Sequence, residues 1–440
     1  MMGLFLTSMA WALDVRLCAQ YEVDFEEQDT LDFDPGDASG DGITDNDYSD
    51  FMNPETKRDP FPMRGLQVVA SRKAASGFWQ EAYRGRAFAA GPHAGCTPVF
   101  QVDDLGGGEG IVRLAVYSEV DVGVHHVDVF DDATSPNYGH VLSPEMTVPA
   151  GRTDLFMGTG DQRFDVAMAL AFALVREDGG NASLSLPVYV GDGTGPRYDV
   201  DEDAIYLAAD NGWPNYVQAA LHEFGHAVFV NRMIAESVSW PTFHYGWDNS
   251  DGNGDTECPV DLAATDAHYR ASDEATVDAI LEGFADYYAL SILNRRTETD
   301  AFLFWAEADW DHDGSDDLGW ISWHRRPLSH MPSAMDKDYW AAECLQDVEN
   351  VSSEYDWARG LWELTTVHGL TTAQILDVFI EADPDSFFVE PGSCQLTPCP
   401  TPTQPSLCAF RCPGPEILDA ASTLGFGAAW SAACAEGICR

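Results

Sequence analysis

The sequence predicts an α+β protein in which a β-rich N-terminal region precedes a region of short strands and long helices. Up to about residue 150, alternating or β-branched runs separated by Gly, Asp and Pro predict strands over residues 66–70, 111–117 and 122–130. Beyond about residue 155 the apolar period changes from two residues to 3.6, which indicates helices. The chain has 440 residues, 45% of them hydrophobic, enough for two domains with a sizeable core.

Two long helices dominate the second region. One opens near Pro214, where a proline fits the first turn, and carries an apolar stripe through Leu221, Phe224 and Val228. The other runs from about Asp273, with acidic residues at its start and basic residues at its end that complement the helix dipole. Its predicted end is at about residue 296. The remaining expected elements are a helix over 163–175, strands over 184–190 and 204–208, and helices over 339–348, 356–367 and 372–381.

The charge balance excludes two classes of partner. The chain has 23 Lys and Arg against 73 Asp and Glu, a formal net charge of −50. Such a surface repels nucleic acid and anionic lipid. No internal stretch reaches the roughly 20 apolar residues of a membrane span, so we expect no membrane insertion.

The two ends of the chain suggest export. Residues 1–12 contain a short apolar run ending in Ala10-Trp11-Ala12, which is either a candidate signal peptide or a buried strand. Ten cysteines lie mostly late in the chain, and residues 391–440 form a Pro- and Cys-rich tail in which we expect disulfides. We therefore expect a secreted, extracellular or periplasmic protein. The alternative for the tail is a zinc knuckle formed by Cys394, Cys399, Cys408 and Cys412.

The helix near Pro214 carries the pattern His222-Glu223-Phe224-Gly225-His226. Histidines four residues apart lie on one helical face, so both imidazoles can reach one metal ion. Glu223 lies about 100° round the helix from His222, where it can act on a water without being a ligand. This arrangement predicts a zinc site with Glu223 as general base.

A catalytic zinc usually has a third protein ligand. A third histidine at the metzincin spacing is absent, because Arg232 stands there. The better candidate is Glu282, which begins Glu282-Gly283-Phe284-Ala285-Asp286 on the second long helix. Together the two segments resemble those of gluzincins, the group that includes thermolysin-like and fungalysin-like peptidases.

The resemblance implies a fold and two residue roles. Glu282 would be the third zinc ligand, and Asp286 would hydrogen-bond a ligand histidine. The fold would be zincin-like over residues 151–390, with a small mixed sheet and active-site helix followed by a mainly helical subdomain. The spacing departs from thermolysin, because 56 positions separate His226 from Glu282 and include an acidic insertion over 248–255. No close subfamily is indicated.

These residues predict a secreted zinc metallopeptidase acting on protein or peptide substrates. The alternatives are a catalytically silent zincin fold that serves as a calcium-dependent extracellular binding module, and a zinc hydrolase for a non-peptide amide. The N-terminal region, residues 13–150, is a propeptide or a binding domain. A histidine or tyrosine would stabilise the oxyanion formed during hydrolysis, but sequence spacing does not favour any one candidate. The candidates are His324, His330, His368, Tyr245, Tyr339 and Tyr355.

Two acidic loops are candidate calcium sites. Each has oxygen-bearing residues at alternating positions but lacks the acidic residue at position 12 of a calcium loop, so each binds calcium or is a plain acidic turn. The first loop contains Asp309, Asp311 and Asp313, and the second contains Asp37, Ser39, Asp41 and Asp45.

Overall fold

The computed structural model describes residues 12–22, 60–157, 162–176, 183–191, 196–207, 216–235, 276–294, 302–307, 322–327, 354–382 and 414–433. The chain divides into two compact units. Unit 1 comprises Met1–Gln28, Glu55–Arg176 and Ser183–Ala220, and unit 2 comprises the rest, chiefly Leu221–Arg440.

Unit 1 contains a mixed sheet in which nine strands are described, seven of them in the order β12-β13-β11-β7-β6-β3-β4, with β8 and β9 also paired to β6. β11 lies parallel to β7 and β13, whereas the other pairs are antiparallel. The strands are β3 (Leu66–Lys73), β4 (Trp79–Arg86), β6 (Glu109–Val122), β7 (His125–Phe130), β8 (His140–Leu142), β9 (Met146–Pro149), β11 (Ser185–Val190), β12 (Arg197–Asp199) and β13 (Ala204–Leu207).

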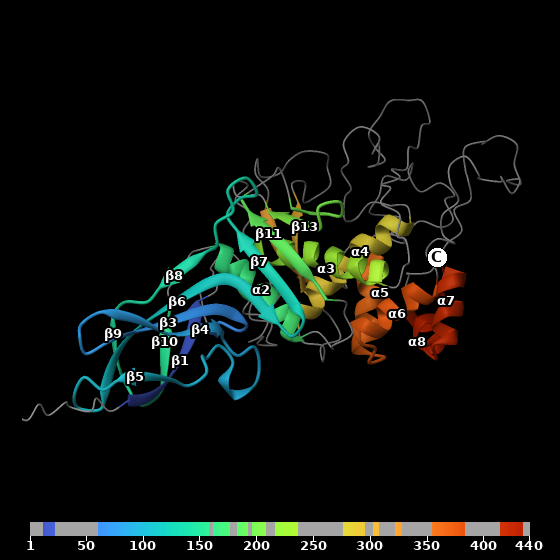
Figure 1. Ribbon diagram of the computed structural model, residues 1–440. Coiled ribbons are helices and arrows are strands. Elements are labelled where there is room, and N and C mark those ends of the chain that lie inside the picture. Colours follow the sequence, from blue (N-terminus) through green and yellow to red (C-terminus); the bar gives the residue numbers. More distant parts are fainter. Residues whose placement is uncertain are drawn as a thin grey trace, which may run out of the picture. The chain divides into compact units, whose positions relative to one another are not determined.

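One face of this sheet is apolar and buried. Along β6, Val112, Leu114 and Val116 are fully buried, and the alternate side chains are more exposed. Helix α2 (Gln162–Arg176), whose described side chains are largely buried, packs on β6 and β7 (Figure 1). The helix predicted over 163–175 is thereby confirmed.

A second sheet of unit 1 forms around β1 (Ala12–Glu22). Its partners are β10 (Gly151–Phe156), which is parallel, and β2 (Pro60–Pro62) and β5 (Phe100–Asp103), which are antiparallel. A disulfide joins Cys18 of β1 to Cys96. Residues 1–11, most of the candidate signal peptide, lie outside the described residues.

Two details of unit 1 differ from expectation. The run 122–130 is not one strand: β6 ends at Val122, Gly123 has a positive φ of 63°, and β7 begins at His125. Glycine adopts this conformation readily, so the chain turns back here as a hairpin. The boundary predicted at residue 150 lies inside the large sheet, because β11 pairs with β7.

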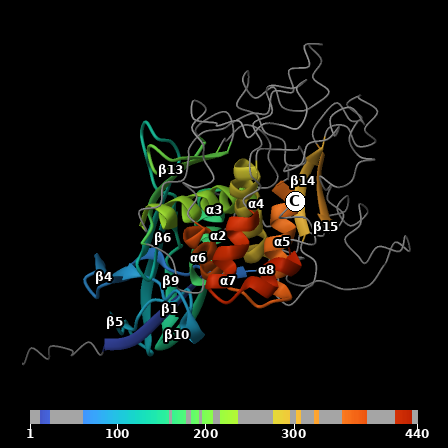
Figure 2. The same cartoon turned by 90° about the vertical axis from the view of Figure 1, so that its right-hand side faces the viewer.

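The described part of unit 2 is helical apart from one hairpin, β14 (Phe302–Glu307) with β15 (Ser322–Pro327). Its helices are α3 (Tyr216–Ala235, of which the part from Leu221 belongs to unit 2), α4 (Thr276–Leu293), α5 (Glu354–Thr366), α6 (Thr372–Glu381), α7 (Gly414–Thr423) and α8 (Gly427–Ala433). α4 packs against α5, and α8 packs against α5 and α7 (Figure 2). α7 and α8 fall within the predicted Pro- and Cys-rich tail.

Aromatic rings form the core of unit 2. Phe379 of α6 contacts the rings of Phe229, Phe284, Trp357 and Trp430, which come from α3, α4, α5 and α8. α6 begins at a capping box, in which Thr371 and Gln374 each accept a hydrogen bond from the other's backbone N–H. The helix predicted over 372–381 has these bounds in the structure.

The structure bears out a mixed α+β protein with sheets and several helices. Among the described residues, none of the helices has the length and apolar character needed to cross a membrane. Both candidate calcium loops, at Asp37, Ser39, Asp41 and Asp45 and at Asp309, Asp311 and Asp313, lie outside the described residues and stay predictions. The same holds for the tail cysteines from Cys394 to Cys412.

Candidate metal centre

Two helices of unit 2, α3 and α4, are buried on nearly all sides at the level of the predicted zinc ligands. Every side chain from residue 220 to 230 of α3 is buried, and so is every one from 282 to 292 of α4. A helix enclosed in this way normally carries apolar residues only. Polar groups within such segments therefore need specific partners.

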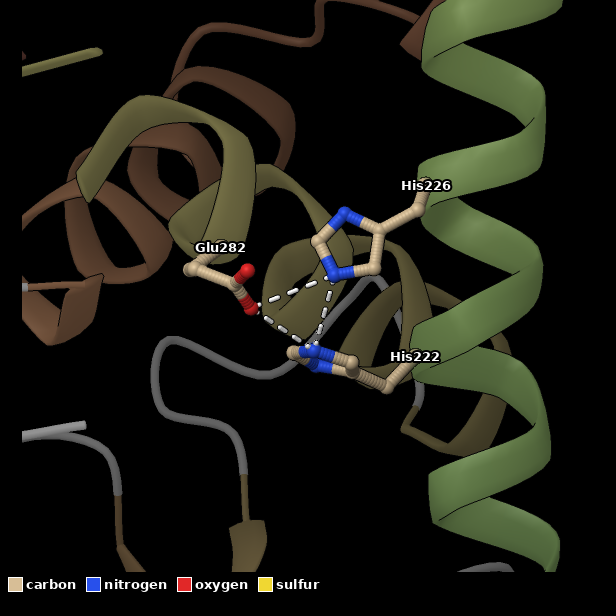
Figure 3. Close-up of side chains that lie close together, drawn as sticks. All are labelled: His222, His226 and Glu282. Atoms are coloured by element: carbon tan, nitrogen blue, oxygen red, sulfur yellow. Dashed lines mark hydrogen bonds and ion pairs between the residues drawn. The ribbon is translucent and has the colours of Figure 1, made fainter. Parts of the chain in front are cut away.

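The polar side chains at this level of the two helices converge on one point. The Nε2 atoms of His222 and His226 are 3.1 Å apart, and Oε2 of Glu282 lies 3.0 Å from the first and 3.1 Å from the second (Figure 3). The three ligand atoms thus form a nearly equilateral triangle. The structure brings together the three residues that the sequence predicts as zinc ligands.

Asp286, one turn beyond Glu282, holds one of the two histidines. Its Oδ1 is 2.8 Å from Nδ1 of His222, and its side chain is completely buried. Since a carboxylate accepts from Nδ1–H, neutral His222 presents a lone pair at Nε2 toward Glu282 and His226. Nδ1 of His226 is buried and has no hydrogen-bond partner among the described residues. The two histidines are therefore supported differently.

The site contains three buried carboxylates beside its two histidines. Glu223, Glu282 and Asp286 are 7%, 6% and 0% exposed. Burying three carboxylates without a cation is strongly unfavourable. Burial, the largest single influence, lowers the pKa of His222, but hydrogen bonds to Asp286 and Glu282 and the charges of Asp286 and Glu223 raise that pKa to about 10. The buried carboxylates therefore favour positive charge beside them, either on His222 or on a bound cation.

The residues fit a zinc ion. Zinc bonds of about 2.0–2.2 Å to nitrogen and oxygen in tetrahedral geometry place the ligand atoms roughly 3.4 Å apart. The observed separations of 3.0–3.1 Å are close to that value. Two imidazole nitrogens and one carboxylate form a known catalytic zinc donor set, and the carboxylate on His222 is the outer partner that such ligands usually have.

Glu223 lies next to the first histidine on α3 but outside the ligand triangle. It is buried, and its charge acts on His222. Of the candidate oxyanion donors only His368 has a described side chain, and its Nε2 lies 3.7 Å from Oε1 of Glu363, at the end of α5. No contact links His368 to the described triangle, and the oxyanion donor stays unassigned.

A second group of possible metal ligands lies in unit 1 and was missed at the sequence level. Glu119 and Asp121 on β6 and His126 on β7 bring three donor atoms close together. Neighbouring residues of a strand point to opposite faces, so the sequence predicts that His125 and His126 are ordinary strand residues and not joint ligands of one metal. In the structure a turn at Gly123 brings Asp121 opposite His126. The sequence signal for this group is the glycine that separates Glu119 and Asp121 from the histidine.

Comparison of the chain with protein-family models, with curated proteins and with solved structures found no significant match in any of the three. Similarity to characterised proteins therefore supplies no function for this chain. The functional proposal therefore rests on the residues of α3 and α4.

Proposed function

We propose that this chain is a zinc metallopeptidase with a zincin-like catalytic region, in which His222, His226 and Glu282 hold the metal. The observation that carries the proposal is the buried triangle of two Nε2 atoms and one carboxylate oxygen between α3 and α4. The burial of the carboxylates of Glu223, Glu282 and Asp286 around this triangle also supports a divalent cation at its centre. The disulfide between Cys18 and Cys96 supports action in an oxidising compartment, such as the extracellular space.

Bound zinc would supply Lewis acidity, which lowers the pKa of a water toward neutrality and polarises a substrate carbonyl. The protein's own groups would do the rest. Glu223 follows His222 directly, so its carboxylate would take a proton from the attacking water and pass it to the leaving amine. Asp286 would fix the tautomer of His222 and raise its basicity.

The test combines metal analysis with hydrolysis of casein. Purified protein should contain about one zinc per chain. Casein cleavage should stop on chelation and return when zinc is added. Glu223→Gln should keep the zinc and the fold while abolishing hydrolysis, since it removes a base and no ligand.

Each negative result has its own meaning. A wild-type protein that binds zinc but cleaves neither casein nor a peptide library would indicate a silent zincin fold or a hydrolase for another amide. Near-normal activity of Glu223→Gln would show that Glu223 is not the base. If the purified protein contains no zinc, the proposal is wrong.

A further inference from the structure

The two helices that carry the candidate ligands approach each other closely at one glycine. Gly225 of α3 lies between the two histidines in sequence, and a Cβ added to it would lie 2.8 Å from Cα and 3.1 Å from O of Ala285. The same Cβ would lie 3.0 Å from Cβ of Tyr288. Two of these neighbours are backbone atoms of α4, which cannot move without moving the helix.

This contact lies at the level of the ligands. Gly225 immediately precedes His226 and follows His222 by three residues, and Ala285 lies between Glu282 and Asp286. The close contact of α3 and α4 at Gly225 therefore lies beside the residues that supply two imidazoles from one helix and a carboxylate from the other. Glycine is a poor helix former, so its presence inside α3 has no local benefit.

We propose that Gly225 is a positioning residue, which sets the distance between α3 and α4 and thereby lets Glu282 complete the ligand set with His222 and His226. The inference rests on the proposed zinc site. Carbon atoms in van der Waals contact are about 3.5–4.0 Å apart. One methyl group at position 225 would therefore push α4 away by roughly 0.7 Å or more.

That displacement exceeds what a zinc site accepts. Ligand distances in functional sites stay within about 0.2 Å of their standard values. The Glu282 carboxylate, now 3.0–3.1 Å from both Nε2 atoms, would no longer reach a metal held by the two histidines. Gly225→Ala should convert a three-ligand site into a two-ligand site without changing any ligand.

The decisive measurement is the zinc dissociation constant of Gly225→Ala, obtained by competition with a chromophoric chelator and paired with the melting temperature of the metal-free protein. We expect zinc binding roughly tenfold weaker or more. The cobalt-substituted variant should give the absorption spectrum of Glu282→Gln rather than that of the wild type.

Phe229→Leu is the matched control. Phe229 packs on Phe284 across the same helix pair, with ring centroids 5.0 Å apart, so its truncation weakens the α3–α4 contact without forcing the helices apart. It should lower the melting temperature and leave the zinc affinity of the folded protein near the wild-type value. A purely structural Gly225 would instead give both variants the same pattern.

A second variant decides the matter if Gly225→Ala does not fold. Glu282→Asp retracts the carboxylate by about 1.5 Å, and α4 cannot follow because it already touches Gly225. Its zinc affinity should fall at least tenfold. Wild-type affinity in Glu282→Asp, or in a folded Gly225→Ala, overturns the spacing role and leaves the zinc proposal intact. A wild-type protein without zinc overturns the zinc proposal itself.

Discussion

Each unit of the molecule contains a histidine beside carboxylates, but the two clusters are built in different ways. In unit 2 the ligand atoms of His222, His226 and Glu282 come from buried helices and face one another. In unit 1, Glu119, Asp121 and His126 lie on a hairpin and are partly exposed. The closeness of the donor atoms alone does not show which of the two clusters would bind a metal ion.

The difference lies in which positive charge compensates the carboxylates. In unit 1, Arg86 pairs with both Glu119 and Asp121, and His126 lies 2.6 Å from Asp121 and 3.1 Å from Asp128 through its two nitrogens. Tyr138 donates a hydrogen bond to the other oxygen of Asp128. The chain's own cations thus occupy the cluster. In the unit 2 site, two imidazole nitrogens and one carboxylate oxygen face one another, and this donor set suits an external cation.

Removal of one carboxylate from each cluster should affect zinc binding in unit 2 only. Glu282→Gln should reduce zinc affinity by more than the roughly 10–100-fold that loss of an outer partner causes, because a direct ligand is lost. Glu119→Gln should leave the zinc content of the purified protein unchanged. Metal analysis after gel filtration measures both. Equal zinc loss in the two variants would mean that both units hold metal.

A smaller effect is expected from the carboxylates that hold the histidines. Asp286→Asn should weaken zinc binding or activity roughly 10–100-fold, because the amide no longer supports the tautomer and basicity of His222. Asp121→Asn, the corresponding change beside His126, should leave zinc affinity unaltered. Chelator competition on both proteins is the measurement. An Asp286→Asn protein with wild-type affinity would contradict the role given to this buried hydrogen bond.

The smallest expected effect concerns pH. For His126, burial lowers the pKa, but the hydrogen bond to Asp121 and the charge of Asp128 outweigh it, and the folded pKa lies above 6.5. Its contribution to stability is therefore present below pH 6.5 and is lost as the pH rises through the folded pKa. For His125, burial lowers the pKa, so its contribution is present above 6.5 and is lost as the pH falls through the folded pKa.

Urea midpoints across pH 5–8 would test these two signs. His126→Gln should flatten the fall in stability toward high pH, and His125→Gln should flatten the fall toward low pH. Both side chains are partly solvated, so the shifts should be small. Variants that shift the midpoint equally at every pH would show that neither histidine changes its pKa on folding.

The candidate metal ligands could be predicted because part of their geometry is local. A four-residue spacing on a helix fixes the relation of His222 to His226, and that of Glu282 to Asp286, whatever the rest of the fold does. The pairing of β11 with β7 and of β1 with β10 was not predictable, because strand partners depend on distant residues. The Asp121–His126 contact depended on one turn, and the role of Gly225 depended on how closely two helices pack.

The position of β1 has a consequence for the order in which unit 1 is made. β1 begins at Ala12, and its parallel partner β10 ends at Phe156. At a synthesis rate of about 5–20 residues per second, β1 waits roughly 7–30 s on the ribosome for this neighbour. Val15, Leu17 and Cys18, all buried in the finished protein, spend that interval without their final environment. The nascent chain therefore exposes these apolar side chains to aggregation until residue 156 has emerged, whereas Cys18 lacks its disulfide partner only until Cys96 has emerged.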